Sequence, residues 1–141
     1  MRRIDGFPLW IGTARDARDI KGVLDAGIEA VVDLAIEEPP ISPTRELVYL
    51  RFPLVDGEGN PPWLLRTVMD AVEELIGSGV QTLVACGAGM SRSPAVAAMV
   101  MSQFMGTEPG EALTALRAGG PCDVSPGLWR ELAPAWYSRD K

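Results

Sequence analysis

The segment from Thr82 to Met101 constrains the fold more than any other part of the chain. It begins with an apolar run ending at Ala85, which predicts a buried strand, and it ends in a run from Ala95 that is typical of a helix. Between the two lies a loop that contains two glycines and one cysteine, Cys86-Gly87-Ala88-Gly89-Met90-Ser91-Arg92-Ser93-Pro94. A cysteine therefore stands where a strand ends and a helix begins.

This loop is suited to binding a tetrahedral oxyanion. The first turn of a helix has unpaired N–H groups and a partial positive charge. Gly87 and Gly89 allow backbone conformations in which several N–H groups point at one anion. Arg92 adds a planar fork of donors that can bind two phosphate oxygens. We expect Ser93 to cap the helix and Pro94 to take its first position.

The cysteine of this loop is a candidate nucleophile. A helix N-terminus and a nearby arginine both favour a thiolate, so Cys86 should ionise more readily than a free thiol. A thiolate beside a phosphate-binding loop indicates covalent phosphoryl transfer to sulfur. The alternative is that Cys86 is an ordinary buried cysteine, because free cysteines are among the most buried residues.

Composition limits the classes of protein to which the chain can belong. Its 141 residues fit one domain, 1–141, and its net charge of −6 argues against a general binder of nucleic acid or anionic membranes. No apolar run could span a bilayer, and Asp5 and Pro8 interrupt the stretch where a signal peptide would be apolar. Two cysteines are too few for a disulfide framework. We therefore expect a cytoplasmic protein, and a monomer.

The chain contains no histidine. This absence excludes Ser-His-Asp and Cys-His catalysis, together with the usual zinc sites. Any proton transfer must then use Asp, Glu, Cys, Lys or Tyr side chains.

Strands and helices alternate along the chain. We expect strands around 3–5, 9–11, 28–34, 47–52 and 82–85. We expect helices at 16–26, 63–76, 94–105, 109–117 and 125–137, the last kinked or ended by Pro134. This order predicts one α/β domain with a central, mostly parallel twisted sheet, helices on both faces, and the phosphate-binding loop between a central strand and a helix. Ligands bind outside the carboxyl ends of such strands.

Phosphoryl transfer to a thiolate leaves an oxyanion that must be protonated, so a nearby acid is required. Asp56 follows a strand that ends on the same side as Cys86, which makes it the main candidate. Glu58 is the rival, and the alternative is that Asp56 only forms a turn with Gly57. Glu37 and Glu38 should repel strongly anionic ligands if their loop borders the site.

These residues resemble the cysteine-based protein tyrosine phosphatases, specifically their small dual-specificity branch. The resemblance rests on the Cys-x5-Arg-Ser motif from Cys86 to Ser93, with Asp56 thirty positions upstream of the cysteine. Weaker similarities lie at 9–12, 27–34 and 111–117. The resemblance implies hydrolysis of a phosphorylated protein or small phosphomonoester, at phosphotyrosine and also at phosphoserine or phosphothreonine. It implies no metal and no cofactor.

The resemblance also implies a role for each residue of the motif. Cys86 would form a phosphocysteine, and Arg92 would hold the phosphate and the transition state. Asp56 would act as general acid and then as base, and Ser93 would help the thiolate to leave. The backbone N–H groups that would bind the phosphate belong to Gly87, Ala88, Gly89, Met90, Ser91 and Arg92.

One departure from the family pattern is plain. The family usually has histidine before the cysteine, where this chain has Ala85, so we expect Cys86 to ionise at a higher pH than in relatives with that histidine. An Ala85→His substitution should lower that pH if the scaffold can still orient the ring. The alternatives are a weak or inactive phosphate-recognition module of the same fold, a phosphatase for a non-protein phosphate, and a sulfurtransferase. Cys122 is either a resolving thiol for Cys86 or an ordinary cysteine.

Overall fold

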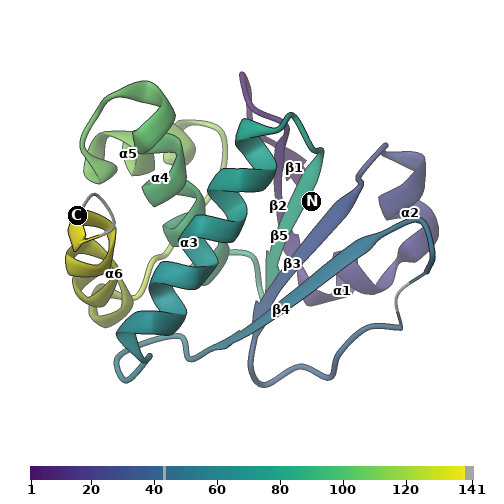
Figure 1. Cartoon of the computed structure of the whole chain (residues 1–141), viewed down its shortest axis with the longest axis horizontal. Coiled ribbons are helices and arrows are strands. Elements are labelled where there is room, and N and C mark those ends of the chain that lie inside the picture. The colour runs from purple at the N-terminus through teal and green to yellow at the C-terminus, as the bar shows by residue number, and fades with distance from the viewer. Residues whose placement is uncertain (43, 139–141) are drawn as a thin grey trace.

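The computed structural model of the chain describes residues 1–42 and 44–138. Figure 1 shows a sheet with helices on both of its faces. In chain order, the elements of the described residues are β1 (Arg2–Arg3), β2 (Leu9–Thr13), α1 (Ala14–Arg18), α2 (Ile20–Asp25), β3 (Ala30–Ala35), β4 (Val48–Leu54), α3 (Pro62–Gly77), β5 (Thr82–Cys86), α4 (Arg92–Met105), α5 (Pro109–Ala118) and α6 (Pro126–Ser138). None of the helices in these residues is long and apolar enough to cross a membrane.

The sheet has the order β1-β2-β5-β3-β4. Strands β2, β5, β3 and β4 are parallel, and only the short β1 pairs antiparallel with its neighbour. Helices α1 and α2 cover one face, whereas α3 to α6 cover the other (Figure 1). The predicted single-domain α/β fold with a mostly parallel sheet is therefore confirmed. The cysteine-bearing β5 lies in the middle of this sheet.

Successive side chains of β5 point to opposite faces of the sheet, as the pleat requires. Val84 and Cys86 pack in the cluster beneath α3, α4 and α6. Leu83 and Ala85 pack in the separate cluster beneath α1 and α2. Helix α4 is buried on all sides from Arg92 to Ser102, which fixes the helix that follows the cysteine within the core.

Two of the expected helices differ from the prediction, one in its continuity and the other in its N-cap residue. The helix expected at 16–26 is divided into α1 and α2 at Asp19, whose carboxylate accepts a hydrogen bond from the Gly22 N–H at 3.1 Å and caps the second helix. The cap of α4 is Ser91 rather than Ser93, which lies inside the first turn of the helix.

Two prolines have less effect than the sequence predicts. Strand β4 runs through Pro53 to Leu54, and it can do so because it lies at the edge of the sheet. Helix α6 continues past Pro134. Its last turn is held by tertiary packing, because Trp136 is buried and its indole N–H donates to the Met99 carbonyl at 2.8 Å.

Candidate active site

The loop from Cys86 to Arg92, here called the cysteine loop, connects β5 directly to α4. Gly89 has a φ of 70°, a left-handed conformation, and a Cβ added there would lie 3.0 Å from the Gly12 carbonyl oxygen. A Cβ on Gly87 would lie 2.8 Å from a carboxylate oxygen of Glu37. Gly89 is thus required by its backbone conformation and by close approach to backbone, whereas a side chain at position 87 would displace the Glu37 carboxylate.

A cleft of about 430 Å³ opens above this loop, and we call it the cysteine cleft. It brings together the segments that follow three neighbouring parallel strands: Glu37 comes after β3, Asp56 after β4, and the cysteine loop after β5. The lining residues are Glu37, Asp56, Cys86, Gly87, Ala88, Met90, Ser91, Arg92 and Asp123. The carboxyl ends of the strands therefore meet as the sequence predicts.

The guanidinium of Arg92 is 5% exposed, and it is paired at one end only. Nη1 and Nη2 donate to the two carboxylate oxygens of Glu37 at 2.6 and 2.5 Å, and Nη1 also donates to the Leu54 carbonyl at 2.9 Å. The buried Nε has no hydrogen-bond partner among the described residues. The fork is therefore fixed from one side, while the Nε–H is among the donors left for an anion.

This pairing shifts the pKa of both partners toward their charged forms. Hydrogen bonding to Arg92 lowers the pKa of Glu37 to about 2. The hydrogen bonds that Arg92 donates to Glu37 raise the pKa of Arg92 above its ordinary value, and the nearby Cys86 and Asp56 add to this. Glu37 is thus an orienting partner of Arg92, a role that the expected repulsion of anions does not include. Glu38 pairs instead with Arg18, at 3.1 Å.

Asp56 is held over the cleft by the cysteine loop itself. Its Oδ1 accepts a hydrogen bond from the Ser91 hydroxyl at 2.6 Å, and the Ser91 oxygen accepts one from the Ser125 N–H at 2.9 Å. Glu58, the rival acid, forms an exposed ion pair with Arg130 at 2.9 Å and is not among the residues that line the cleft. The geometry therefore favours Asp56 as the acid.

Ser93 lies beneath the cleft rather than in its wall. It is fully buried in the first turn of α4, and its hydroxyl has no hydrogen-bond partner within the described part of the chain. The Ser93 hydroxyl is therefore not committed to another described side chain or carbonyl.

Cys122 is half-buried, and its sulfur accepts a long hydrogen bond from Arg2, at 3.7 Å. It does not line the cysteine cleft, so the geometry gives no support to a resolving role.

The mostly parallel sheet has a central strand that ends in a Cys-x5-Arg loop, and the next strand but one supplies an acid to the same cleft. A loop that leads into a helix N-terminus in this way is suited to binding an oxyanion. Solved structures share the fold. The chain is similar to human DUSP28, with 24% identity over 94% of each chain and a TM-score of 0.80. It is similar to a mouse putative dual specificity phosphatase complexed with zinc tungstate, with 23% identity over 98% of this chain and 91% of that one, at a TM-score of 0.79.

A third similar structure is the human tyrosine phosphatase-like serine/threonine/tyrosine-interacting protein, with 19% identity over 95% of this chain and 94% of that one, at a TM-score of 0.78. No protein-family model and no curated protein sequence matches the chain. The resemblance to the small dual-specificity branch of the cysteine-based phosphatases is thus confirmed in the fold.

The position of Ala85 changes the expectation attached to the missing histidine. Ala85 is fully buried on the face of β5 opposite Cys86, beside Asp33 of β3. The carboxylate of Asp33 already accepts hydrogen bonds from the Tyr49 hydroxyl at 2.7 Å and the Ala35 N–H at 3.3 Å. An imidazole at position 85 would therefore enter a filled layer, in which the neighbouring carboxylate of Asp33 already has partners, and it would not lie directly beside the sulfur.

We accordingly predict that Ala85→His destabilises the fold by about 1–3 kcal/mol, the usual cost of overpacking a core. Chemical denaturation of the two proteins measures the difference in the free energy of unfolding. Ala88→His, at an exposed position of the cysteine loop, is the control. An unchanged free energy of unfolding in Ala85→His would show that the layer has room for the ring.

The Glu37–Arg92 pair should make the stability of the fold depend on pH in the acidic range. Because the pKa of Glu37 falls from 4.5 to about 2 on folding, its contribution is complete above pH 4.5 and is lost as the pH falls through about 2. The melting temperature of Glu37→Gln should lie below that of the wild type at pH 6, and the gap should narrow toward pH 2. Glu38→Gln, at the exposed pair with Arg18, should show little gap at any pH. A constant gap for Glu37→Gln would contradict the assignment.

Proposed function

We propose that the chain is a phosphomonoester hydrolase that acts through a phosphocysteine intermediate. The observation that carries this proposal is the meeting of Cys86, Arg92 and Asp56 around one cleft of about 430 Å³. The fold neighbours are dual-specificity and tyrosine phosphatases, which supports phosphatase function in general. One of them was solved with zinc tungstate, and tungstate is a tetrahedral oxyanion like phosphate.

In the first step, the thiolate of Cys86 attacks phosphorus, and the bond between phosphorus and the leaving oxygen breaks. Asp56 gives its proton to that oxygen. Arg92, through its unpaired Nε, and the N–H groups of the cysteine loop stabilise the charge on the three remaining phosphate oxygens.

In the second step, Asp56 takes a proton from water, which attacks the phosphorus of the phosphocysteine. The sulfur–phosphorus bond breaks, and inorganic phosphate and the Cys86 thiolate are released. The buried hydroxyl of Ser93, which has no other described partner, donates a hydrogen bond to the departing thiolate. In this proposal the polar groups left unpaired in the site are used by the reaction.

The proposed substrate is a phosphorylated protein, at phosphotyrosine and also at phosphoserine or phosphothreonine, or else a small phosphomonoester. The cleft carries the carboxylates of Glu37, Asp56 and Asp123 against the single cation of Arg92. This balance supports a substrate with one phosphate and neutral or basic surroundings. We propose that the protein acts as a cytoplasmic monomer, independently of metals, nucleic acids and membranes.

The covalent mechanism predicts a specific pattern of losses. Hydrolysis of an aryl phosphate should persist in the presence of a chelator and vanish in Cys86→Ser. It should fall about 100-fold to 1,000-fold in Arg92→Ala, because an oriented donor to a developing oxyanion is worth about that much. Cys122→Ser serves as the matched control. Tight binding of tungstate without hydrolysis would instead identify a phosphate-recognition module.

The role of Asp56 predicts a dependence on the leaving group. Asp56→Asn should lower the turnover of phosphotyrosine about 100-fold or more, because a phenol of ordinary acidity needs a proton as it leaves. An activated aryl ester should lose far less. Glu58→Gln is the comparison, since Glu58 points away to Arg130. Equal losses on both esters would remove Asp56 from the role of acid.

A further inference from the structure

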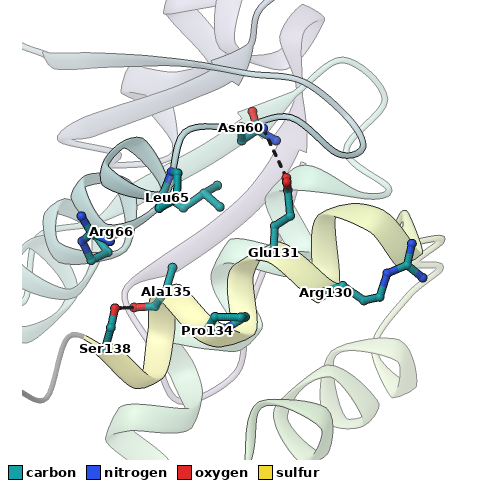
Figure 2. Close-up of a pocket in the computed structure, with 9 residues that line it drawn as sticks. Asn60, Leu65, Arg66, Arg130, Glu131, Pro134, Ala135 and Ser138 are labelled. Carbon is teal, nitrogen blue, oxygen red and sulfur yellow. Dashed lines mark hydrogen bonds between the residues drawn. The ribbon is translucent and has the colours of Figure 1, made fainter.

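The loop that carries Asp56 is bound to a helix far away in the sequence. This segment, residues 55–61, joins β4 to α3 and is here called the acid loop. The carboxylate of Glu131, in α6, accepts hydrogen bonds from the Gly59 N–H at 3.1 and 3.0 Å and from the Asn60 N–H at 3.2 Å. Figure 2 shows Glu131 reaching from α6 to Asn60.

Asn60, which Glu131 binds, is itself hydrogen-bonded to both neighbours of Asp56. Its side chain is buried, and it accepts from the Val55 N–H at 2.8 Å and donates to the carbonyls of Val55 at 2.9 Å and Gly57 at 3.2 Å. The residues immediately before and after Asp56 are therefore both bound to Asn60. The backbone on either side of the acid depends on a residue that Glu131 holds.

The start of α6 also contacts the acid loop directly. A Cβ added to Gly127 would lie 2.6 Å from the Glu58 side chain and 3.3 Å from the Glu58 backbone nitrogen. The loop thus rests closely on the first turns of α6, so a shift of either would move the other.

Glu131 cannot itself contact a phosphate bound at Cys86. It lines a different cleft of about 510 Å³ between α3 and α6, with Leu65 and Pro134, and it is not among the residues that line the cysteine cleft (Figure 2). Any influence of Glu131 on the reaction must therefore pass through the acid loop.

We propose that Glu131 is a positioning residue, which holds the acid loop so that Asp56 faces Cys86. Ser91 then holds the carboxyl group of Asp56, while Asn60, which Glu131 binds, holds the backbone of the residues on either side of it. Protonation of the leaving group depends on this restraint, whereas binding of the phosphate at the cysteine loop does not. This inference rests on the proposed phosphatase function.

The test is a series of aryl phosphates with leaving groups of graded acidity, hydrolysed by the full chain. Glu131→Ala should lower kcat/KM about 10-fold to 100-fold for the poorest leaving group and much less for the best, since a displaced catalytic group costs about that much. The dependence on leaving-group acidity should therefore steepen toward that of Asp56→Asn. Glu131→Gln, which keeps an oxygen acceptor, should restore most of the wild-type dependence.

Arg130→Gln is the matched control, because Arg130 neighbours Glu131 in α6 and meets the same loop only through an exposed ion pair. It should leave the dependence unchanged. If Glu131→Ala does not fold, as a thermal melt will show, Glu131→Asp takes its place, because its carboxylate is withdrawn by one methylene group. The proposal is overturned if kcat/KM in these Glu131 variants depends on leaving-group acidity as it does in the wild type, while the dependence in Asp56→Asn is steep.

Hydrogen exchange separates this failure from failure of the proposed function. If the wild type hydrolyses none of the esters, the proposed function fails. The exchange rates of the Gly59 and Asn60 amides then test whether Glu131 holds the acid loop. Faster exchange in Glu131→Ala than in Arg130→Gln supports it, and equal exchange overturns it.

Discussion

The arrangement of the site depends on the hydrogen bonds that surround the buried guanidinium of Arg92. A cation taken out of water is costly unless charged and polar groups surround it. Glu37 after β3 and the Leu54 carbonyl at the end of β4 supply those groups, while Arg92 itself begins α4 after β5. One side chain thus fixes the ends of three strands relative to one another, and the cleft that they enclose follows from this.

The parts of the fold that the sequence predicts are those in which local signals agree with tertiary packing. Around Cys86, an apolar strand leads through a loop with two glycines into an apolar helix. The apolar strand and the apolar helix both predict burial in the centre of the domain, and the structure buries both. A parallel sheet brings the carboxyl ends of its strands together, so the position of Asp56 near Cys86 follows from strand order alone. Pairing of the acid with Ser91 then adds detail to a position already expected.

The parts that the sequence does not reveal are pairings between distant residues. Glu37 and Arg92 are 55 positions apart, and Glu131 and Asn60 are 71 apart. A glutamate in a loop or on a helix face has the same sequence appearance whether it is solvated or holds a partner. The division of the first helix at Asp19 was missed for a related reason, because one side-chain cap outweighs a continuous apolar pattern.

The cysteine loop and the acid loop are held in place by different contacts, so their local stabilities are unequal. The cysteine loop continues into α4, which is buried on all sides in the main core, so exposing it requires opening much of the domain. The acid loop is held by a few hydrogen bonds, those of Asn60 within the loop and those to Glu131 and Ser91. Opening of this loop would be a local fluctuation that leaves the nucleophile and its phosphate site intact. A molecule in that open state retains the groups that capture phosphate and lacks the group that completes turnover.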